Sequence, residues 1–384
     1  MTLQEIGDVP TTPVWYNGFL AMTSQPSSCI EELSPRVYKL EIVGWEITLR
    51  CNLQCLHCGS SAGPSSTRTC ELDLEECKSV VRQLVALGTS RIVLSGGEPF
   101  LCDHWEPLAQ FICDQGIYLQ FVSNGTLIDD NLSRKLQNLP GKVAVGLSLD
   151  GAVPETHENL RNSPGLFQKV LRAIKLLRVH GIPVAVITTV HKDNLAELRG
   201  LYKLLLQSGV YVWQIQLAMP SGRMSDHPEM VLSGEESLSL ARFIARVRDE
   251  GNLRVVAGDN LGYYNSLEIK LRESLWTGCP AGIRALGIRS NGDVTGCLSL
   301  QETAAEGNVR EKSLAEIWLN PELFSYNRKF KISDLEGECK DCKFGSLCRG
   351  GCSFLCKSLT GEYHNNPLCL RLYDRGSDSV IFVG

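Results

Sequence analysis

The stretch Cys51-Asn-Leu-Gln-Cys55-Leu-His-Cys58 decides how we interpret both the fold and the chemistry of this chain. It places three cysteines at C-x3-C-x2-C spacing directly after an apolar run, Ile42 to Leu49, which predicts a loop that follows a buried β-strand. Three thiolates this close together can bind three corners of a cubic [4Fe–4S] cluster, because cysteine sulfur ligates such clusters. The fourth corner would lack a protein ligand and would be free to accept a substrate or cofactor.

Zinc is the alternative metal for this stretch, because zinc takes four Cys or His ligands and His57 lies among the cysteines. His57 and Cys58 are adjacent, however, so their side chains would diverge if the segment were extended. We therefore favour the cluster.

The composition is that of an ordinary globular protein. The 384 residues predict one large domain with an appendage, or two domains. Hydrophobic residues make up 43% and charged residues 21%, and the formal charge of −5 comes without a block of like charge, which argues against partners such as nucleic acid or an anionic membrane. No apolar run approaches the ~20 residues that cross a bilayer, and the N-terminus has no secretory signal pattern. We expect a cytoplasmic protein.

Sixteen cysteines are too many for inert packing, and eleven of them fall within 51–58 and 279–369. A disulfide scaffold is disfavoured in a large chain without an export signal, so metal or cluster ligation is the better explanation. We expect the five scattered cysteines to be small buried hydrophobic residues: Cys29, Cys70, Cys77, Cys102 and Cys113.

Short β-branched runs alternate with helical patterns from about 38 to 217, which predicts βα units and a parallel sheet. The expected strands are 42–49, 91–95, 118–122, 143–149, 183–190 and 212–217, and the expected helices are 73–87, 104–115, 130–137, 165–180 and 194–208. The predicted fold class is α/β, a partial (β/α)6 TIM-like barrel, in which chemistry collects at the carboxyl ends of the strands.

The rest of the chain is organised around that barrel. Residues 1–37 predict a loosely structured arm, and 218–270 a bridging region with a helix over 233–249 that begins at Ser233. Residues 271–384 form a small cysteine-rich domain with little room for a core, so it needs metal or clusters to fold.

Polar residues follow the predicted strands. The second strand ends in Ser95-Gly96-Gly97-Glu98-Pro99, where the glycines allow a ligand to approach the backbone and the carboxylate can accept a hydrogen bond from an ammonium group. Later strands end in Ser123-Asn124-Gly125 and Ser148-Leu149-Asp150-Gly151. Each of these sequences is also common in plain turns.

The three-cysteine loop, followed one βα unit later by Gly-Gly-Glu-Pro, resembles the radical S-adenosylmethionine (SAM) enzymes. The resemblance implies that Cys51, Cys55 and Cys58 bind a [4Fe–4S] cluster whose electron cleaves SAM to methionine and a 5′-deoxyadenosyl radical, which abstracts hydrogen from the substrate. It further assigns SAM contacts to Gly96, Gly97, Glu98 and Pro99 (amino group), Ser148 and Arg161 (carboxylate), Ser123, Asn124 and Asp150 (ribose) and Leu217 (adenine).

The second cysteine group resembles the seven-cysteine SPASM domain, which binds two auxiliary [4Fe–4S] clusters. By position, the nearer cluster would take Cys279, Cys297 and Cys352, and the outer cluster Cys339, Cys342, Cys348 and Cys369. Cys356 would complete the nearer set; we favour an ordinary buried cysteine or a radical-handling thiol there, which leaves one iron open. A zinc ribbon is the alternative for the C-x2-C pair.

Enzymes of this kind mostly act on peptides and proteins, so the resemblance implies maturation of a ribosomally made precursor peptide by crosslinking, epimerisation or backbone excision. The alternatives are a sulfatase-type formylglycine maturase, disfavoured because Cys58 is followed by Gly-Ser-Ser rather than aromatic residues, and a reaction on a small molecule or tetrapyrrole. A zinc-binding interaction protein is the non-enzymatic alternative. The expected partners are the precursor peptide, a separate leader-recognition protein and an electron donor such as flavodoxin or ferredoxin.

Overall fold

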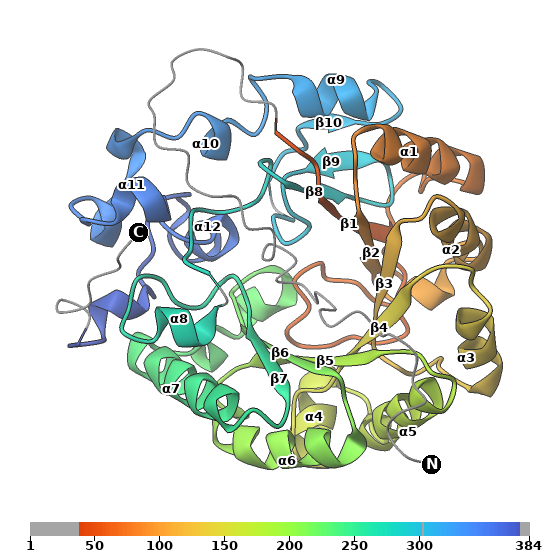
Figure 1. Cartoon of the computed structure of the whole chain (residues 1–384), viewed down its shortest axis with the longest axis horizontal. Coiled ribbons are helices and arrows are strands. Elements are labelled where there is room, and N and C mark those ends of the chain that lie inside the picture. Colours follow the sequence, from red (N-terminus) through yellow and green to blue (C-terminus); the bar gives the residue numbers. More distant parts are fainter. Residues whose placement is uncertain (1–37, 273, 302, 377–384) are drawn as a thin grey trace.

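The computed structural model describes residues 38–272, 274–301 and 303–376, and the arm expected over 1–37 lies outside these residues. Within them, one curved sheet of ten strands has the order β10-β9-β8-β1-β2-β3-β4-β5-β6-β7. Figure 1 shows the strands around a central space with the helices on the outside. The predicted fold class, an α/β partial barrel, is confirmed.

All six predicted strands are present, and each pairs in parallel with the next. Their inward and outward side chains alternate: on β1, for example, Val43, Trp45 and Ile47 are buried among the outer hydrophobic residues, whereas Gly44 and Glu46 line the interior. The strands are β1 (Ile42–Thr48), β2 (Arg91–Gly96), β3 (Tyr118–Ser123), β4 (Val143–Ser148), β5 (Val184–Val190) and β6 (Val212–Leu217).

The helices between these strands cover the outside of the sheet. Local sequence explains where they begin: Asp73 and Glu76 form a capping box at the start of α1, and Asp129 caps α3. The helices α1 (Leu74–Ala86), α2 (Trp105–Asp114), α3 (Asp130–Gln137), α5 (Leu166–Val179) and α6 (Leu198–Ser208) agree with the prediction. Helix α4 (Pro154–Arg161) was not predicted, because it is short and mostly polar.

Two further parallel strands extend the barrel. Strand β7 (Arg254–Ala257) pairs with β6, and it lies in the region expected to be a bridge, after α7 (Gly234–Glu250) and its Ser233 cap. Strand β8 (Ala285–Ile288), expected in the C-terminal domain, pairs with β1 at the other edge. Strands β9 (Asp293–Thr295) and β10 (Gly307–Asn308) continue from β8 in antiparallel order.

The amino-terminal end of the barrel is closed by small side chains. Ala144, Ala185, Val212 and Val256 form a separate buried cluster, and the Tyr118 ring packs against it. Because these residues lie early in their strands, we call this cluster the barrel floor. The cavity at the barrel mouth lies toward the other end, at the carboxyl ends of the strands.

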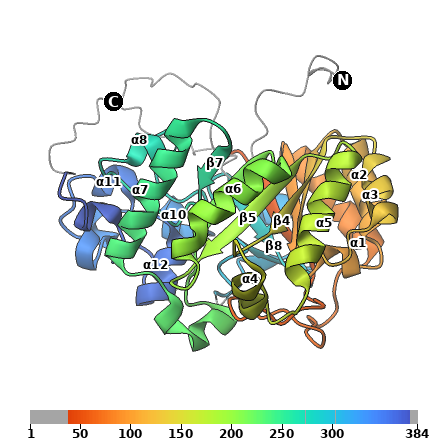
Figure 2. The ribbon, with the colours of Figure 1, turned by 90° about the horizontal axis from the view of Figure 1, so that it is seen from below.

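The C-terminal chain consists of short helices. They are α8 (Glu268–Leu271), α9 (Leu314–Leu319), α10 (Ser325–Arg328), α11 (Gly345–Cys348) and α12 (Ser353–Thr360). Figures 1 and 2 both place α10, α11 and α12 on the same side of the molecule as α7 and α8, away from α1 to α3. The cysteine-rich chain thus lies next to the β7–β8 gap.

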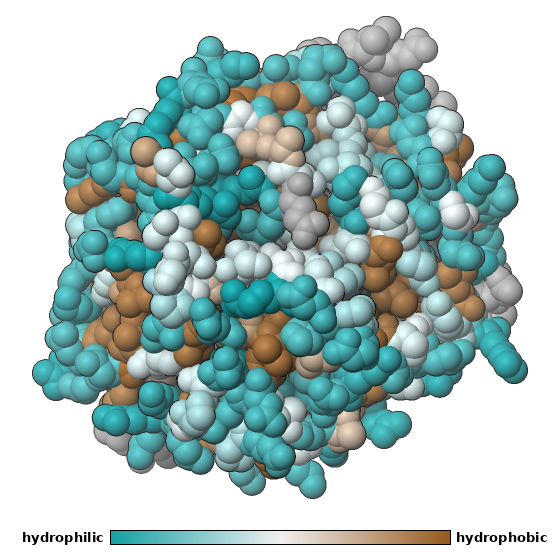
Figure 3. All heavy atoms as spheres, turned by 180° about the vertical axis from the view of Figure 1, so that it is seen from behind, coloured by the Kyte–Doolittle hydropathy of each residue, from teal (hydrophilic) through white to brown (hydrophobic). Residues whose placement is uncertain are grey.

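The surface is mixed in polarity (Figure 3), and three of the scattered cysteines are buried. On the face in Figure 3, hydrophobic residues are interspersed with hydrophilic ones. Among the described helices, none is both long and apolar enough to span a bilayer. Cys77, Cys102 and Cys113 are buried as predicted, but the prediction is wrong for Cys70, which is exposed in a turn with a φ of 54°. Cys29 lies outside the described residues.

Candidate active site

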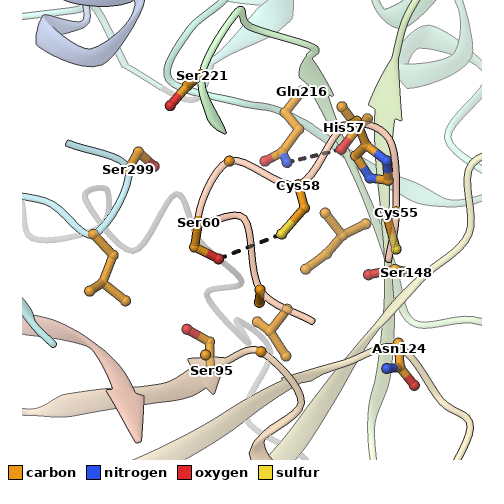
Figure 4. Close-up of a pocket in the computed structure, with 18 of the residues that line it drawn as sticks. Cys55, His57, Cys58, Ser60, Ser95, Asn124, Ser148, Gln216, Ser221 and Ser299 are labelled. Carbon is orange, nitrogen blue, oxygen red and sulfur yellow. Dashed lines mark hydrogen bonds between the residues drawn. The ribbon is translucent and has the colours of Figure 1, made fainter. Parts of the chain in front are cut away.

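The three-cysteine loop lies at the carboxyl end of β1, at the open mouth of the barrel. Cys51 and Cys55 are each 8% exposed, Cys58 is partly buried, and all three line one cavity of about 350 Å³. Figure 4 shows Cys55 and Cys58 on the loop that crosses this cavity, with side chains from several strand ends around it. The structure therefore brings the three predicted ligands to a common space.

Backbone hydrogen bonds hold the loop at both ends. The Cys51 amide donates to the Gly63 carbonyl at 3.1 Å, and the Leu56 amide donates to the Leu160 carbonyl of α4 at 2.9 Å. The unpredicted helix α4 is thus part of the frame that fixes the loop.

Arg223 clamps the loop from the other side of the cavity. Its Nε donates to the Cys55 carbonyl at 2.8 Å and its Nη2 to the Ala62 carbonyl at 2.7 Å, while its backbone amide donates to the Cys58 carbonyl at 3.1 Å. Arg223 could not be recognised from the sequence, because its partners are backbone carbonyls far away in the chain.

The loop thiols lie in a poorly solvated environment. Burial raises the pKa of Cys51 to about 11 and also raises the pKa of Cys55. Cluster ligation requires thiolates, so bound iron would have to supply the positive charge that stabilises them. The cysteine donor set suits iron–sulfur ligation.

The zinc alternative finds no preformed site. Within residues 38–272, 274–301 and 303–376, no three His, Cys, Asp or Glu side chains group closely enough to hold a single metal ion. The His57 ring contacts Arg161 instead, with 3.4 Å between its Nε2 and Arg161 Nη2. Burial lowers the pKa of His57 to about 4.

Gly96 and Gly97 line the cavity at the end of β2. A Cβ on Gly97 would stand 2.1 Å from the Arg50 carbonyl oxygen, and Gly96 has a φ of +145°, so both positions require glycine. These glycines let the end of β2 pass directly under the chain that leads to Cys51. The close approach that the structure shows is to the loop backbone, and the approach of a ligand to these glycines stays a prediction.

Glu98 and Pro99 are buried behind the cavity wall. The Glu98 carboxylate accepts hydrogen bonds from Ser123 Oγ at 2.9 Å and from the Asn124 amide at 2.8 Å, which ties the end of β2 to the end of β3. Burial raises the pKa of Glu98 to about 7.

Ser123 and Asn124 both line the cavity. The Asn124 side-chain amide donates to Asn52 Oδ1 at 2.9 Å and lies 3.8 Å from Cys51 Sγ. Asn124 therefore connects the end of β3 to the three-cysteine loop.

Asp150 and Arg161 form a buried ion pair. Arg161 Nε donates to Asp150 Oδ2 at 2.7 Å, and Arg161 Nη1 lies 3.9 Å from Cys55 Sγ. Burial by itself would raise the pKa of Asp150. The attraction of Arg161, with smaller contributions from His57 and His157, is stronger, so the pKa of Asp150 is lowered. Arg161 lines the cavity, whereas Asp150 lies behind it and also accepts from the Thr189 amide at 2.9 Å.

Ser148 and Leu217 line the cavity from the ends of β4 and β6. The backbone of Leu217 is fixed by Asn260, whose side chain accepts from the Leu217 amide at 3.2 Å and donates to its carbonyl at 3.0 Å. Side chains to which the sequence assigned no SAM contact complete the lining, including Ser95, Gln214, Gln216, Ser221, Ser299, Gln301 and Phe354.

The C-terminal cysteines gather around two other cavities. Cys279, Cys297 and Cys352 line one of about 150 Å³, and Cys339, Cys342, Cys348 and Cys369 line one of about 300 Å³. These are the two groups that the resemblance implied. Leu298, Ser299 and Phe354 line both the first of these cavities and the cavity at the barrel mouth, so the two adjoin.

Cys356 lines none of the three cavities. Its side chain is fully buried, and its Sγ donates to the Gly350 carbonyl at 3.0 Å. Cys279 differs from its neighbours, because a hydrogen bond from Cys352 lowers the pKa of Cys279, whereas burial raises the pKa of Cys297 to about 11.

Comparison with known proteins agrees with this geometry. Residues 45–205 match the radical SAM superfamily, and residues 279–343 match the SPASM iron–sulfur cluster-binding domain. The chain is 30% identical to an AdoMet-dependent heme synthase of Methanosarcina barkeri over 86% of this chain and 96% of that protein. It is 29% identical to the mycofactocin maturase MftC of Mycolicibacterium smegmatis over 84% and 80%.

Among solved structures, Streptococcus suis SuiB bound to S-adenosylmethionine aligns with a TM-score of 0.70 and 18% identity, over 86% of this chain and 77% of SuiB. At this identity the likeness concerns the fold alone. The sequence matches, the partial barrel and the grouped cysteines lead to one conclusion: this chain is an enzyme that belongs to the radical SAM superfamily and carries a C-terminal SPASM domain.

Proposed function

We propose that this enzyme modifies a ribosomally made precursor peptide. The observation that carries the proposal is the chemistry of the cavity at the barrel mouth. Its polar side chains are mostly neutral amides and hydroxyls, among them Gln214, Gln216, Ser221, Ser299 and Gln301. Amides and hydroxyls both donate and accept hydrogen bonds, which suits the alternating groups of a peptide backbone.

The cations of this cavity are already engaged by the protein. Arg161 pairs with Asp150, and Arg223 donates to the carbonyls of the three-cysteine loop. A tetrapyrrole carries several carboxylates, which are best recognised by free guanidinium or ammonium groups. The mouth of the barrel offers no such set among the described residues.

In the proposed mechanism, Cys51, Cys55 and Cys58 hold the SAM-binding [4Fe–4S] cluster. When bound, SAM and this cluster supply a 5′-deoxyadenosyl radical for hydrogen abstraction. The chain itself orients these groups: Arg223 and α4 fix the loop, Gly97 allows the strand end to pass beneath it, and Glu98 aligns the ends of β2 and β3.

The SAM contacts assigned from the resemblance remain part of the proposal. Ser123, Asn124, Ser148, Arg161 and Leu217 line the cavity and are available for direct contact. Asp150 would act by holding the Arg161 guanidinium in place, and Glu98 by positioning Ser123 and the Asn124 amide.

The two C-terminal groups would hold auxiliary clusters. Cys279, Cys297 and Cys352 line a cavity that adjoins the one at the barrel mouth, so a cluster held by them would be available to accept an electron from the substrate. Cys339, Cys342, Cys348 and Cys369 would hold the outer cluster. A carrier such as flavodoxin or ferredoxin would donate the electron that the SAM-binding cluster needs. We also propose that a separate protein recognises the leader of the precursor.

A tetrapyrrole reaction is the second candidate. It is favoured by the relative from Methanosarcina barkeri, which is named a heme synthase and aligns over 96% of its own length. The relative named mycofactocin maturase has a similar identity, 29% against 30%, so the percentages alone do not choose between the two classes.

A substrate competition distinguishes the two candidates. The anaerobic holoenzyme is incubated with SAM and dithionite, and with either iron coproporphyrin or short precursor peptides encoded next to its gene. Mass spectrometry then measures 5′-deoxyadenosine and the products. We expect a peptide to stimulate deoxyadenosine formation and to lose two hydrogens, exchange hydrogen for deuterium from D2O, or lose a residue-sized fragment. Turnover of the porphyrin with all peptides unmodified would reject the proposal.

A further inference from the structure

Asp259 lines the smaller of the two C-terminal cavities, the one whose cysteines are Cys279, Cys297 and Cys352. It follows the carboxyl end of β7 by two positions, and both of its neighbours in the chain are anchored. The Gly258 amide donates to the Ile215 carbonyl at 2.7 Å. The Asn260 side chain forms hydrogen bonds with both backbone polar groups of Leu217. The end of the sheet therefore fixes where Asp259 lies.

A single hydroxyl group connects Asp259 to Cys352. Tyr263 Oη donates to the Asp259 carbonyl and accepts a hydrogen bond from the Cys352 amide at 3.1 Å. The Tyr263 side chain is buried, so this connection lies in the interior of the protein. Asp259 and Cys352 are thus neighbours in the fold, although they are distant in sequence.

The Asp259 carboxylate has no partner within residues 38–272, 274–301 and 303–376, because it forms no ion pair and no hydrogen bond there. Burial raises the pKa of Asp259, and the positive charges of Arg272 and Arg284 offset this only in part. Arg272 is itself paired with Glu268, whose carboxylate accepts from the Arg272 Nε at 3.0 Å. A carboxylate withdrawn from water without a hydrogen bond or a close cation is costly, so the position needs an explanation.

Negative charge converges on this cavity. Burial is the main cause that raises the pKa of Cys297, and the charge of Asp259 adds to it. A hydrogen bond to Cys279 is the main cause that raises the pKa of Cys352, and Asp259 adds to this shift as well. Cluster ligation needs the cysteines as thiolates, which brings three negative charges next to the carboxylate. Positive charge between these groups, such as that of iron, allows all four to stay ionised.

Three cysteines leave one corner of a [4Fe–4S] cluster without a thiolate. Among the residues that the structure describes, no fourth cysteine lines this cavity. Cys356 is the remaining candidate thiol, but it lines neither C-terminal cavity and its Sγ donates to the Gly350 carbonyl at 3.0 Å. For the protein to hold all four irons, the last ligand must be a donor of another kind.

We propose that Asp259 is the fourth protein ligand of the nearer auxiliary cluster. A cubic cluster takes its ligands at separate corners, so the four residues surround it and need not converge on one point. Histidine replaces cysteine at some clusters, and carboxylates bind iron at other sites, so an Asp at one corner agrees with iron chemistry.

The outer cavity provides a comparison. Its four cysteines supply a thiolate for every iron of a cluster: Cys339, Cys342, Cys348 and Cys369. Asp341 also lines that cavity, but it is exposed and no corner is left for it. An aspartate is therefore needed as a ligand in the cavity with three thiols and superfluous in the cavity with four.

This inference rests on the proposed auxiliary cluster, but not on whether the substrate is a peptide or a porphyrin. With every iron held by the protein, the substrate cannot bind to an iron of this cluster. The cluster then serves the substrate only by accepting its electron.

The first test asks whether residue 259 reaches the cluster. The SAM-binding cluster, which has an iron without a protein ligand, is removed by replacing Cys51, Cys55 and Cys58 with Ala. Mössbauer spectra of the anaerobic protein then separate irons with four sulfur ligands from an iron with an oxygen ligand. We expect one oxygen-ligated iron per chain in this parent and none in Asp259→Cys, with the same total iron. Asp341→Cys is the matched control, and it should keep the oxygen-ligated iron.

Two results of this test would overturn the assignment. If the oxygen-ligated iron persists in Asp259→Cys, residue 259 does not reach the cluster and that iron binds water. If the parent has no such iron, a fourth thiolate completes the cluster.

The second test distinguishes the carboxylate from a water molecule on the same iron. Mercaptoethanol is titrated into the parent and into Asp259→Ala, because an iron without a protein ligand takes an added thiolate. We expect the thiol to bind Asp259→Ala at least about tenfold more tightly than the parent, in which the carboxylate competes for the iron. Equal affinities would reject the ligand. If Asp259→Ala loses the cluster, retention of iron in Asp259→Cys supports the ligand, and loss in both variants rejects it.

Both tests are independent of the substrate competition described above. Turnover of the porphyrin alone would reject the peptide function and leave Asp259 as a ligand. The contrary results named for these two tests would reject the ligand and leave the peptide function.

Discussion

The loop at the barrel mouth and the C-terminal cysteine segment, residues 337–376, hold their cysteines in different ways. The loop follows β1, whose Val43 and Trp45 are fully buried in the main hydrophobic core. In residues 337–376, the buried hydrophobic residues are four cysteines and two leucines: Cys339, Cys348, Cys352, Cys356, Leu355 and Leu370.

The difference shows what each region depends on. The barrel has enough apolar core to fold without its cofactor, so the loop is presented by a finished structure. The C-terminal segment has helices of at most eight residues and a core made largely of thiols. Such a segment takes its stability from what the thiols bind.

Replacing Cys51, Cys55 and Cys58 together by Ala tests the barrel side of this comparison. We expect deoxyadenosine formation to fall at least about a thousandfold, while the melting temperature of the protein without clusters changes by only a few degrees. Product analysis and circular dichroism measure these two effects, and anaerobic iron and sulfide assays measure the expected loss of one cluster. Unchanged deoxyadenosine formation would contradict the proposed ligands, and global unfolding would contradict the comparison.

Replacing Cys339 and Cys342 by Ala tests the other side. Without these thiols we expect the segment to open more often. Limited proteolysis within 337–376 should then accelerate at least about tenfold, which corresponds to a decrease of about 1.4 kcal/mol in the free energy of opening. Fragment masses locate the cleavage. The double variant Cys70→Ala, Cys113→Ala serves as the control, since these two cysteines lie outside the cavities. Equal protection in both variants would show that the segment folds without its thiols.

Lowering the pH tests the barrel side of the comparison, because the barrel contains a buried histidine that must stay neutral in the folded protein. His157 is fully buried and its Nδ1 accepts from the Asp150 amide at 3.1 Å; burial lowers its pKa from 6.5 to about 4. Between these two pH values, His157 binds a proton in the unfolded chain but not in the folded chain. The free energy of unfolding therefore falls as pH drops from about 6.5 to 4. In His157→Gln we expect the fall in the free energy of unfolding over this pH range to be smaller by about 2 kcal/mol, measured by denaturant titrations at each pH. If the free energies of unfolding of parent and variant fell in parallel with pH, His157 would not be the group responsible.

Replacing Cys356 is expected to have the smallest effect, and it decides whether this cysteine belongs to the nearer ligand set. Because its thiol faces Gly350 and no cavity, we expect Cys356→Ala to keep its full iron content and to lose about 1 kcal/mol of stability through packing. Cys352→Ala, the matched variant, should lose iron. Iron analysis of both proteins decides, and equal losses would add Cys356 to the nearer ligand set.

Periodicity predicted the six βα strands to within a residue or two, since each is a buried apolar run between turn residues. It missed β7, which has four residues, and α4, whose face is mostly polar. The resemblance to the SPASM domain implied the two groups of C-terminal cysteines that the structure brings together.

The remaining site features could not be predicted, because they depend on partners distant in sequence. Arg223 acts on carbonyls more than 160 positions earlier in the chain, and Asp150 is recognisable as the partner of Arg161 only once β4 and α4 are placed.

The pairing of β8 with β1 has a consequence for biosynthesis. The edge of β1 that receives Ala285–Ile288 is the first edge of the barrel to be made and the last to be covered. During translation the sheet therefore keeps an open side next to Cys51 until nearly three quarters of the chain has left the ribosome. An exposed strand edge invites pairing with other chains, so release of a truncated product that stops before β8 should favour aggregation.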